Sequence, residues 1–167
     1  NKYFAEFNFG FNGSERFAKS ERFGFFPSFG VGWYVSNEPF MEQYEDVITK
    51  LKLKGTYGLV GNDQIGSAED RFFYISQVNL NDGGMGSMFG EEFSNYINGV
   101  SIDRYANDQI TWEKATMTNI GFEIGLFGKF DLQADYFTEY RSNILMDRAQ
   151  TPSTMGLQAA IRANVGE

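Results

Sequence analysis

Five segments of the chain alternate apolar and polar residues with a period of two. The clearest is Tyr3 to Asn12, where four aromatic residues and one alanine fall on one face and glutamate, asparagine and glycine fall on the other. Similar alternation covers residues 25–35, 50–59, 112–126 and 130–141. A period of two places successive side chains on opposite faces of a β-strand. The pattern therefore predicts an all-β, antiparallel protein whose sheet is apolar on one face and polar on the other.

Two architectures use such a sheet. A soluble sandwich buries the apolar face against a second sheet, whereas an outer-membrane β-barrel turns it to lipid and keeps the polar face for a watery lumen. The alternation alone is compatible with both.

Two short connections are also predicted. Gly128 and Lys129 lie between two alternating segments and indicate a tight hairpin turn. Asn37 is a candidate helix cap, Pro39 suits a first turn, and Phe40 and Tyr44 are four residues apart, so one or two helical turns are expected there.

A long connection is predicted between Val60 and about Ile110, where the alternation stops. Turn-forming residues are frequent in it, for example at 61–63, 79–84 and 98–99. Irregular stretches of this length are usually functional or disordered. Its scattered aromatic residues provide material for local packing, which favours a functional connection over a disordered one.

The composition narrows the chemistry. The 167 residues include 18 Phe and 19 Gly but no Cys and no His, so disulfides, thiolate nucleophiles and the commonest general base and metal ligand are missing. The net charge of −8 disfavours a nucleic-acid surface. The chain has no run of about 18 apolar residues, so no transmembrane helix is predicted. The mean hydropathy of −0.37 is compatible with strands that alternate lipid-facing and lumen-facing residues.

Several motifs, in chain order, resemble those of the SusC/RagA family of TonB-dependent outer-membrane transporters of Bacteroidetes. The motifs are Gly24–Ser28 with Gly32–Trp33, Glu38–Phe40, Leu51–Gly58 with Gly61–Asn62, Trp112–Lys114 with Thr118–Gly121, and Asp135–Phe137 with Thr151–Gly156. The last two of these motifs correspond to a strand of that family and to its continuation.

The resemblance implies five or six transmembrane strands of a larger barrel of about 22 strands that is closed by a plug. Residues 1–167 would form part of the barrel domain, and residues 60–112 would form one long extracellular loop. The plug and the TonB-contacting region have no counterpart in the chain, so an internal or C-terminal-half part of a longer protein is expected. The turn at Gly128-Lys129 and residues 38–49 would be periplasmic, with residues 13–22 outside.

The function that the resemblance implies is nutrient import across the cell outer membrane. A SusD-like lipoprotein and the external loops would capture the substrate, and the TonB complex would drive displacement of the plug. We expect oligosaccharides as the substrate, with oligopeptides as the second choice. No catalytic residue is predicted, and the expected partners include membrane lipid but no nucleic acid.

Aromatic residues of the long connection are the candidate substrate-binding residues, because sugar rings and peptide side chains both stack on exposed rings. Packing within the loop, or against the partner lipoprotein, is the alternative for each of them. The candidates are Phe72, Phe73, Tyr74, Tyr96 and Tyr105.

Charged residues offer two weaker possibilities. Lys50, Lys52 and Lys54 share one strand face, and we interpret them as neutralising nearby acids rather than guiding an anionic substrate. Asp63, Glu69 and Asp70 lack the spacing of an EF-hand, so they are interpreted as solvated acids, and neither a metal nor another cofactor is expected.

Two other functions stay open at this point. One is a small self-contained barrel with a structural or adhesive role, since about eight strands can close around their own side chains. The other is a secreted β-sandwich that binds glycans, which would need its apolar faces to meet in a core.

Overall fold

The computed structural model describes residues 1–67 and 70–167. These residues form nine strands and three short 3-10 helices, and they divide into two compact units. Unit 1 contains residues 1–12, 24–62 and 114–142, and unit 2 contains residues 13–23, 63–113 and 143–167. None of the helices in the described part of the chain has the length and apolarity needed to cross a membrane.

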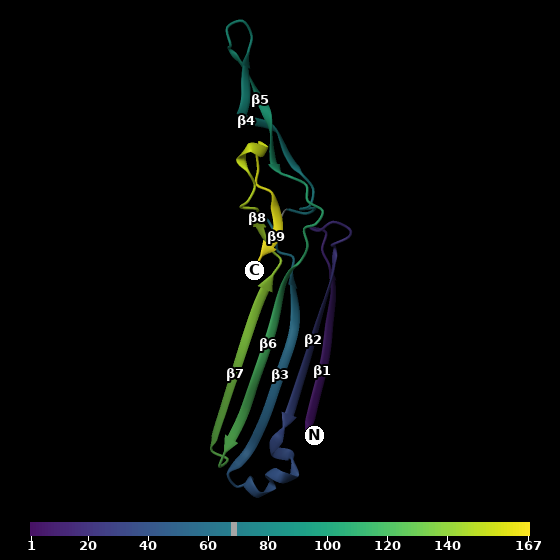
Figure 1. Ribbon diagram of the computed structural model, residues 1–167, viewed down its shortest axis with the longest axis vertical. Coiled ribbons are helices and arrows are strands. Elements are labelled where there is room, and N and C mark those ends of the chain that lie inside the picture. The colour runs from purple at the N-terminus through teal and green to yellow at the C-terminus, as the bar shows by residue number, and fades with distance from the viewer. Residues whose placement is uncertain (68–69) are drawn as a thin grey trace. The chain divides into compact units, whose positions relative to one another are not determined.

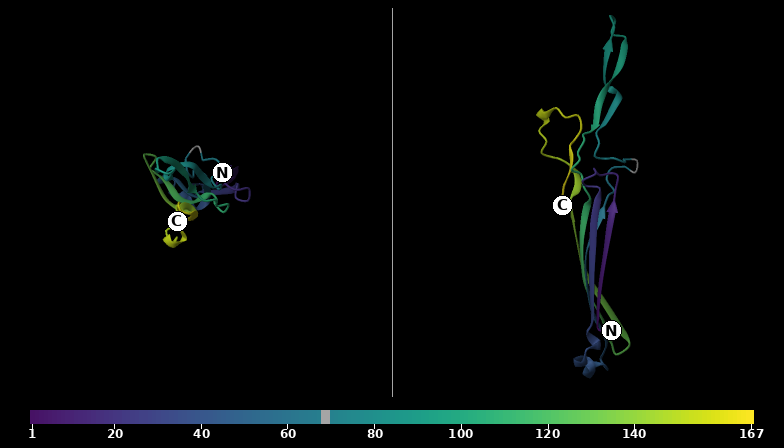
Figure 2. Two further views of the ribbon diagram at one scale, coloured as in Figure 1. Left: turned by 90° about the horizontal axis from the view of Figure 1, so that it is seen from above. Right: turned by 90° about the vertical axis from the view of Figure 1, so that its right-hand side faces the viewer.

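Unit 1 is a five-stranded sheet whose strands lie side by side (Figure 1 and the right view of Figure 2). Its strands are 11–15 residues long and correspond to the five alternating segments, with ends that differ from the predicted ones by up to three residues. The prediction of five antiparallel strands is thus confirmed for the two pairs whose register is resolved, β2 with β3 and β6 with β7. In spatial order the strands are β1 (Tyr3–Gly13), β2 (Phe23–Tyr34), β3 (Ile48–Asn62), β6 (Glu113–Leu126) and β7 (Phe130–Ser142).

The strand register places the apolar residues of neighbouring strands opposite one another. Trp33 pairs with Leu53, and Ile120 pairs with Tyr136. Directly opposed residues of an antiparallel pair lie on the same face, so the apolar residues form one continuous surface. The side chains of this surface are solvent-exposed, with Tyr136 at 69%. A sandwich would need a second sheet over them, which the described residues of unit 1 do not supply.

The connection from β2 to β3 contains the predicted helical turns, which are 3-10 helices. They are η1 (Val35–Asn37) and η2 (Pro39–Tyr44). The prediction of Asn37 as the cap is wrong, because the residue before η2 is Glu38, in an extended conformation. Pro39 explains the shift, since a proline at the first helical position keeps the preceding residue extended. Asn37 instead donates its side-chain amide to the carbonyl oxygen of Asn1 at 3.1 Å.

The turn from β6 to β7 lies one residue earlier than predicted. Phe127 and Gly128 both have positive φ, at 56° and 62°, and the Lys129 N–H donates to the Leu126 carbonyl at 3.0 Å. Two central residues with positive φ define the hairpin turn that matches the twist of the strands. Phe127 was overlooked because aromatic residues rarely adopt this conformation.

Unit 2 contains two small antiparallel sheets, β4 (Gln77–Phe89) with β5 (Asn95–Arg104) and β8 (Ile144–Asp147) with β9 (Arg162–Gly166), and the 3-10 helix η3 (Ser153–Met155). The prediction that residues 60–110 are irregular is therefore wrong. Three register irregularities interrupt the β4–β5 pairing, between Gln77 and Ser87. Each irregularity shifts the alternation of faces, so no period of two survives in the sequence.

The core of unit 2 is aromatic. Phe17 and Phe73 are almost fully buried, and Trp112 is 5% exposed. The rings of Phe17 and Trp112 lie 5.3 Å apart, and the Trp112 indole N–H donates to the Arg22 carbonyl at 3.3 Å. Trp112, predicted at the start of a strand, thus precedes β6 and packs in unit 2.

Candidate functional site

The five candidate aromatic residues all belong to unit 2, but they differ in exposure. Phe73 is 1% exposed, and its ring is covered by guanidinium groups, Arg104 at 4.3 Å and Arg162 at 5.8 Å. A cation over the face of an aromatic ring is attracted by the ring electrons. Phe73 is therefore the centre of a packed cluster and presents no ring face to a ligand.

Acidic residues hold both arginines in place. Arg104 pairs with Asp70 at 3.1 Å and donates to the Ile75 carbonyl at 3.1 Å, and Arg162 pairs with Asp147 at 3.0 Å. The Ser67 backbone N–H donates to Asp70 at 2.9 Å. This N–H, then Arg104 and then the Ser67 hydroxyl hold the pKa of Asp70 below its usual range.

A polar pocket of about 380 Å³ opens beside this cluster. Carboxylates and guanidinium groups both line it, so it offers acceptors and donors to the hydroxyl or amide groups of a ligand. The lining residues are Asp70, Phe73, Gln77, Asp103, Arg104, Asp147, Ala160 and Arg162.

Phe72 and Tyr74 are the candidates nearest to Phe73 in the sequence. Phe72 is 44% exposed with a positive φ of 54°, and its ring meets the Tyr74 ring edge-to-face at 6.5 Å. Tyr105 is half-buried, and its hydroxyl oxygen accepts the Gln158 N–H at 3.2 Å.

Tyr96 lies elsewhere. It pairs with Met88 near the turn of the β4–β5 hairpin, whereas Gln77 and Arg104 pair at the opposite end. Its hydroxyl donates to the Gly83 carbonyl across the hairpin. The structure thus groups the first three candidates along the chain and separates them from Tyr96.

The β4–β5 hairpin is a twisted two-stranded ribbon (Figures 1 and 2). Leu80 is 76% exposed, and several other apolar side chains of the ribbon are about half exposed. A two-stranded ribbon is marginally stable alone, and apolar surface of this extent commonly marks an interaction site. These side chains are Val78, Leu80, Met85, Met88, Phe89, Tyr96, Ile97 and Val100.

The polar face of unit 1 carries an ion-pair network. The Glu123 carboxylate lies 2.6 Å from Lys50, 3.7 Å from Lys52 and 3.9 Å from Lys54, and Lys54 also pairs with Asp135 at 2.9 Å. The prediction that the three lysines neutralise nearby acids is confirmed.

The calcium possibility gains no support. Glu69 lies outside the described residues, and Asp70 is engaged by Ser67 and Arg104. Within 1–67 and 70–167, no group of three His, Cys, Asp or Glu residues is placed to hold a metal ion.

Sequence reasoning missed the arginine cluster. Arg104 and Arg162 lie on different strands in separate small sheets, and no spacing in the sequence indicates that both cover Phe73. The one available signal was the run of three aromatic residues at 72–74 within a polar connection.

Comparisons with known proteins show which proteins the chain is similar to. No protein-family model matches the chain. It is 30% identical to the TonB-dependent receptor SusC of Bacteroides thetaiotaomicron over 99% of the chain and 16% of that receptor. It is 29% identical to a TonB-dependent receptor of Formosa agariphila over 99% of the chain and 15% of that receptor.

Solved structures agree on the fold. The RagAB peptide importer in its closed-closed state matches with a TM-score of 0.74 and 24% identity, over 99% of this chain and 16% of the matched chain. The open-open state matches with the same TM-score and identity.

The chain is homologous to SusC/RagA-type TonB-dependent receptors and spans about 15% of the length of the curated relatives it matches. TonB-dependent receptors are β-barrel proteins of the outer membrane and act as transporters rather than enzymes.

Proposed function

We propose that this chain forms part of the barrel wall and external surface of a SusC/RagA-type TonB-dependent nutrient importer. The observation that carries the proposal is the asymmetry of the unit 1 sheet. One face is exposed and apolar from β1 to β7, and the other face carries the ion-pair network around Glu123. Strands of about 9–11 residues suffice to cross a bilayer, and these strands are 11–15 residues long.

Unit 2 would then lie outside the cell. The chain leaves unit 1 three times to form it, after β1, β3 and β7, whereas the connections after β2 and β6 are shorter than the excursion after β3. Outer-membrane barrels have short periplasmic turns and longer external loops, which supports this orientation.

The proposed partner of unit 2 is a SusD-like surface lipoprotein. The β4–β5 hairpin supports this proposal, because its apolar side chains lie outside any core that the described residues form. Coupling to TonB is assigned to other parts of the full-length protein.

Oligosaccharides are the proposed substrate, with oligopeptides as the alternative. Phe72 and Tyr74 offer rings for stacking, and the polar pocket offers donors and acceptors for sugar hydroxyl groups. The name of the RagAB peptide importer favours the alternative, but its 24% identity bears on the fold alone.

Uptake by intact cells tests the function. We would delete the gene for the full-length protein, restore it on a plasmid, and measure uptake of labelled oligosaccharides and oligopeptides of matched size. We expect oligosaccharide uptake to be lost and restored with the gene, and to be abolished when TonB is inactivated. Unchanged uptake of both substrates would contradict the importer function. Loss of peptide uptake alone would mean that oligopeptides, and not oligosaccharides, are the substrate.

A hairpin variant tests the partner. Leu80→Asp places a charge on the exposed ribbon, and Asn81→Asp places the same charge on the neighbouring residue of the same strand without removing an apolar side chain, while keeping an oxygen acceptor for the Asn98 side chain. We expect the lipoprotein to co-purify with the full-length Asn81→Asp variant and to be depleted from Leu80→Asp. Equal recovery in both variants would exclude the hairpin as the contact.

A further inference from the structure

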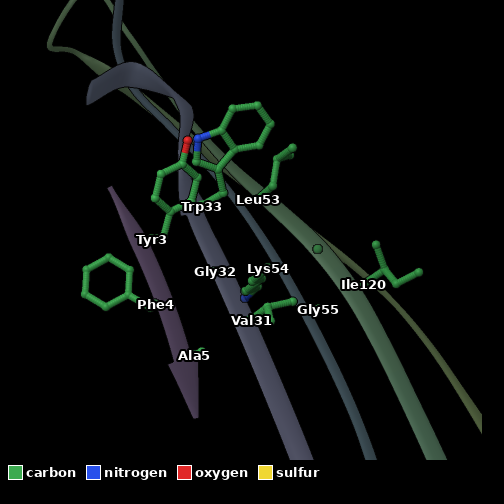
Figure 3. A pocket seen from close by; sticks show the side chains of 11 residues that line it. Tyr3, Phe4, Ala5, Val31, Gly32, Trp33, Leu53, Lys54, Gly55 and Ile120 are labelled. Carbon is green, nitrogen blue, oxygen red and sulfur yellow. The ribbon is translucent and has the colours of Figure 1, made fainter. Parts of the chain in front are cut away.

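The apolar face of unit 1 is not uniform, because it contains a groove of about 780 Å³ across β1, β2, β3 and β6 (Figure 3). Tyr3, Trp33, Leu53 and Ile120 line the groove together with the small residues Ala5 and Gly55. Pockets of about 300–1,000 Å³ are large enough for small organic ligands. We call this feature the apolar-face groove.

Small residues create the groove. Gly55 pairs with Val31 in the register of β2 and β3, and both lie on the apolar face. A Cβ at Gly55 would make only ordinary contacts, 3.8 Å from Val31 and 3.9 Å from the Asn119 carbonyl. The space above Gly55 is therefore open, and a longer side chain there would fill it.

One end of the groove is polar. The Tyr3 and Trp33 rings stack with centroids 6.2 Å apart. The Tyr3 hydroxyl donates to the Glu38 carboxylate at 2.6 Å, and the Trp33 indole N–H donates to it at 3.2 Å. Two aromatic walls thus point their polar tips at one carboxylate.

Lys2 completes this polar end. Its ammonium lies 3.1 Å from Glu38, while 41% of the Lys2 side chain is exposed and only 12% of the Glu38 side chain is. An ammonium has three N–H donors, so Lys2 can bind Glu38 and still donate to an oxygen anion. Glu38 is already engaged by three donors, and they hold its pKa below the usual range, with Tyr3 having the largest effect.

We propose that the apolar-face groove binds one membrane phospholipid, with an acyl chain over Ala5 and Gly55 and the phosphate at Lys2. The proposal rests on the proposed function, in which this face contacts the bilayer. The apolar walls match an acyl chain, the exposed ammonium matches a phosphate, and aromatic residues with polar tips suit the membrane interface. The bound lipid would be retained longer than its neighbours.

Photo-crosslinking of the full-length protein tests the site. The protein would be reconstituted in vesicles of phosphatidylethanolamine and phosphatidylglycerol that contain a little phosphatidylethanolamine with a diazirine in one acyl chain. Crosslinked residues would be mapped by mass spectrometry. Leu132 and Tyr136 serve as the reference, because they lie on the same apolar face outside the groove, at 58% and 69% exposure. We expect several-fold more labelling in the groove than at the reference residues.

Variants sharpen the test. Gly55→Leu should fill the groove and reduce its labelling to the reference level, and Thr56→Leu adds the same side chain to the opposite face and should leave the excess unchanged. Ala5→Leu is a second filling variant in case Gly55→Leu fails to assemble. Lys2→Gln should reduce the excess in the groove without changing the reference.

The outcomes separate the two proposals. Equal labelling of groove and reference in the wild type means ordinary boundary lipid and overturns the lipid site. An excess that persists in an assembled filling variant also overturns it. Absence of acyl labelling at the groove and at Leu132 and Tyr136 alike would instead overturn the membrane orientation in the proposed function.

Discussion

The two units place aromatic side chains in opposite positions. In unit 1, Phe9 and Tyr136 are 65% and 69% exposed on the sheet face, whereas in unit 2 Phe17 and Phe73 are almost completely buried. Unit 2 therefore has an aromatic core, although the β4–β5 hairpin exposes several apolar side chains. Unit 1 has the reverse arrangement, with aromatic side chains exposed on the sheet face, as on the lipid-facing side of an outer-membrane barrel. The contrast is the one expected if unit 1 forms the proposed barrel wall and unit 2 the proposed external structure.

Removing the buried ring of unit 2 has the largest expected effect on this contrast. Phe73→Ala should destabilise unit 2 by about 3–5 kcal/mol, because it leaves a cavity under Arg104 and Arg162. Hydrogen exchange of the full-length protein should show faster exchange in unit 2 and unchanged protection in the sheet. Phe72→Ala, at an exposed neighbouring ring, should change little. Equal loss of protection in the sheet would mean that the two units are not independent.

A charge on the exposed face of unit 1 should have the next largest effect. Phe9→Arg should cost about 2–4 kcal/mol near the bilayer midplane and lower the fraction of protein assembled in the outer membrane. Asn8→Arg places the same charge on the opposite, polar face and should assemble normally. Heat-modifiable migration of the folded barrel measures assembly, and equal tolerance of both variants would show that the apolar face does not contact lipid.

The polar face of unit 1 should be less sensitive. Glu123→Gln removes the shared acid from three lysines, and we expect a cost of about 1–2 kcal/mol, between the values for exposed and buried ion pairs. Glu139→Gln is the matched control, because its contact with Arg141 is more exposed. Guanidinium unfolding of the reconstituted full-length protein measures the difference. A larger loss in the control would mean that the network around Glu123 is not the main stabilising contact of this face.

The smallest expected effect is on the pH dependence of the stability of unit 2. The pKa of Asp70 is lowered in the folded state, so its contribution to stability is complete above the ordinary carboxyl pKa and is lost as the pH falls through the lowered value. Proteolysis of unit 2 should accelerate at acidic pH in the wild type and depend less on pH in Asp70→Asn. An identical pH profile in the two proteins would remove Asp70 as a cause.

The sequence predicted unit 1 far better than unit 2, for a physical reason. Strands with one apolar face repeat every two residues, and the repeat is interrupted only once in Tyr3–Gly13, at Phe4, and once in Phe130–Ser142, at Phe137. In β4 and β5 the register irregularities and the glycines between Asp82 and Ser87 remove the repeat, so the sequence predicts irregular chain where the structure has a hairpin.

The candidate site shows the same division. Aromatic residues of the long connection were identified, but their exposure depends on tertiary contacts. Phe73 is buried because Arg104 and Arg162 cover it, and these residues come from β5 and β9. No local sequence pattern predicts such a tertiary contact. Phe72 and Phe73 therefore look equivalent in the sequence but differ in exposure in the structure.

The turn at Phe127 and Gly128 has a consequence for the order of assembly. It joins thirteen consecutive residue pairs of β6 and β7 through a very short link. Closing a short loop costs little chain entropy. Pairing of β3 with β6 costs more, because it closes a loop of about fifty residues. The β6–β7 hairpin should therefore form early, during passage to the membrane. β3 would then pair with a β6 strand whose register with β7 is already fixed.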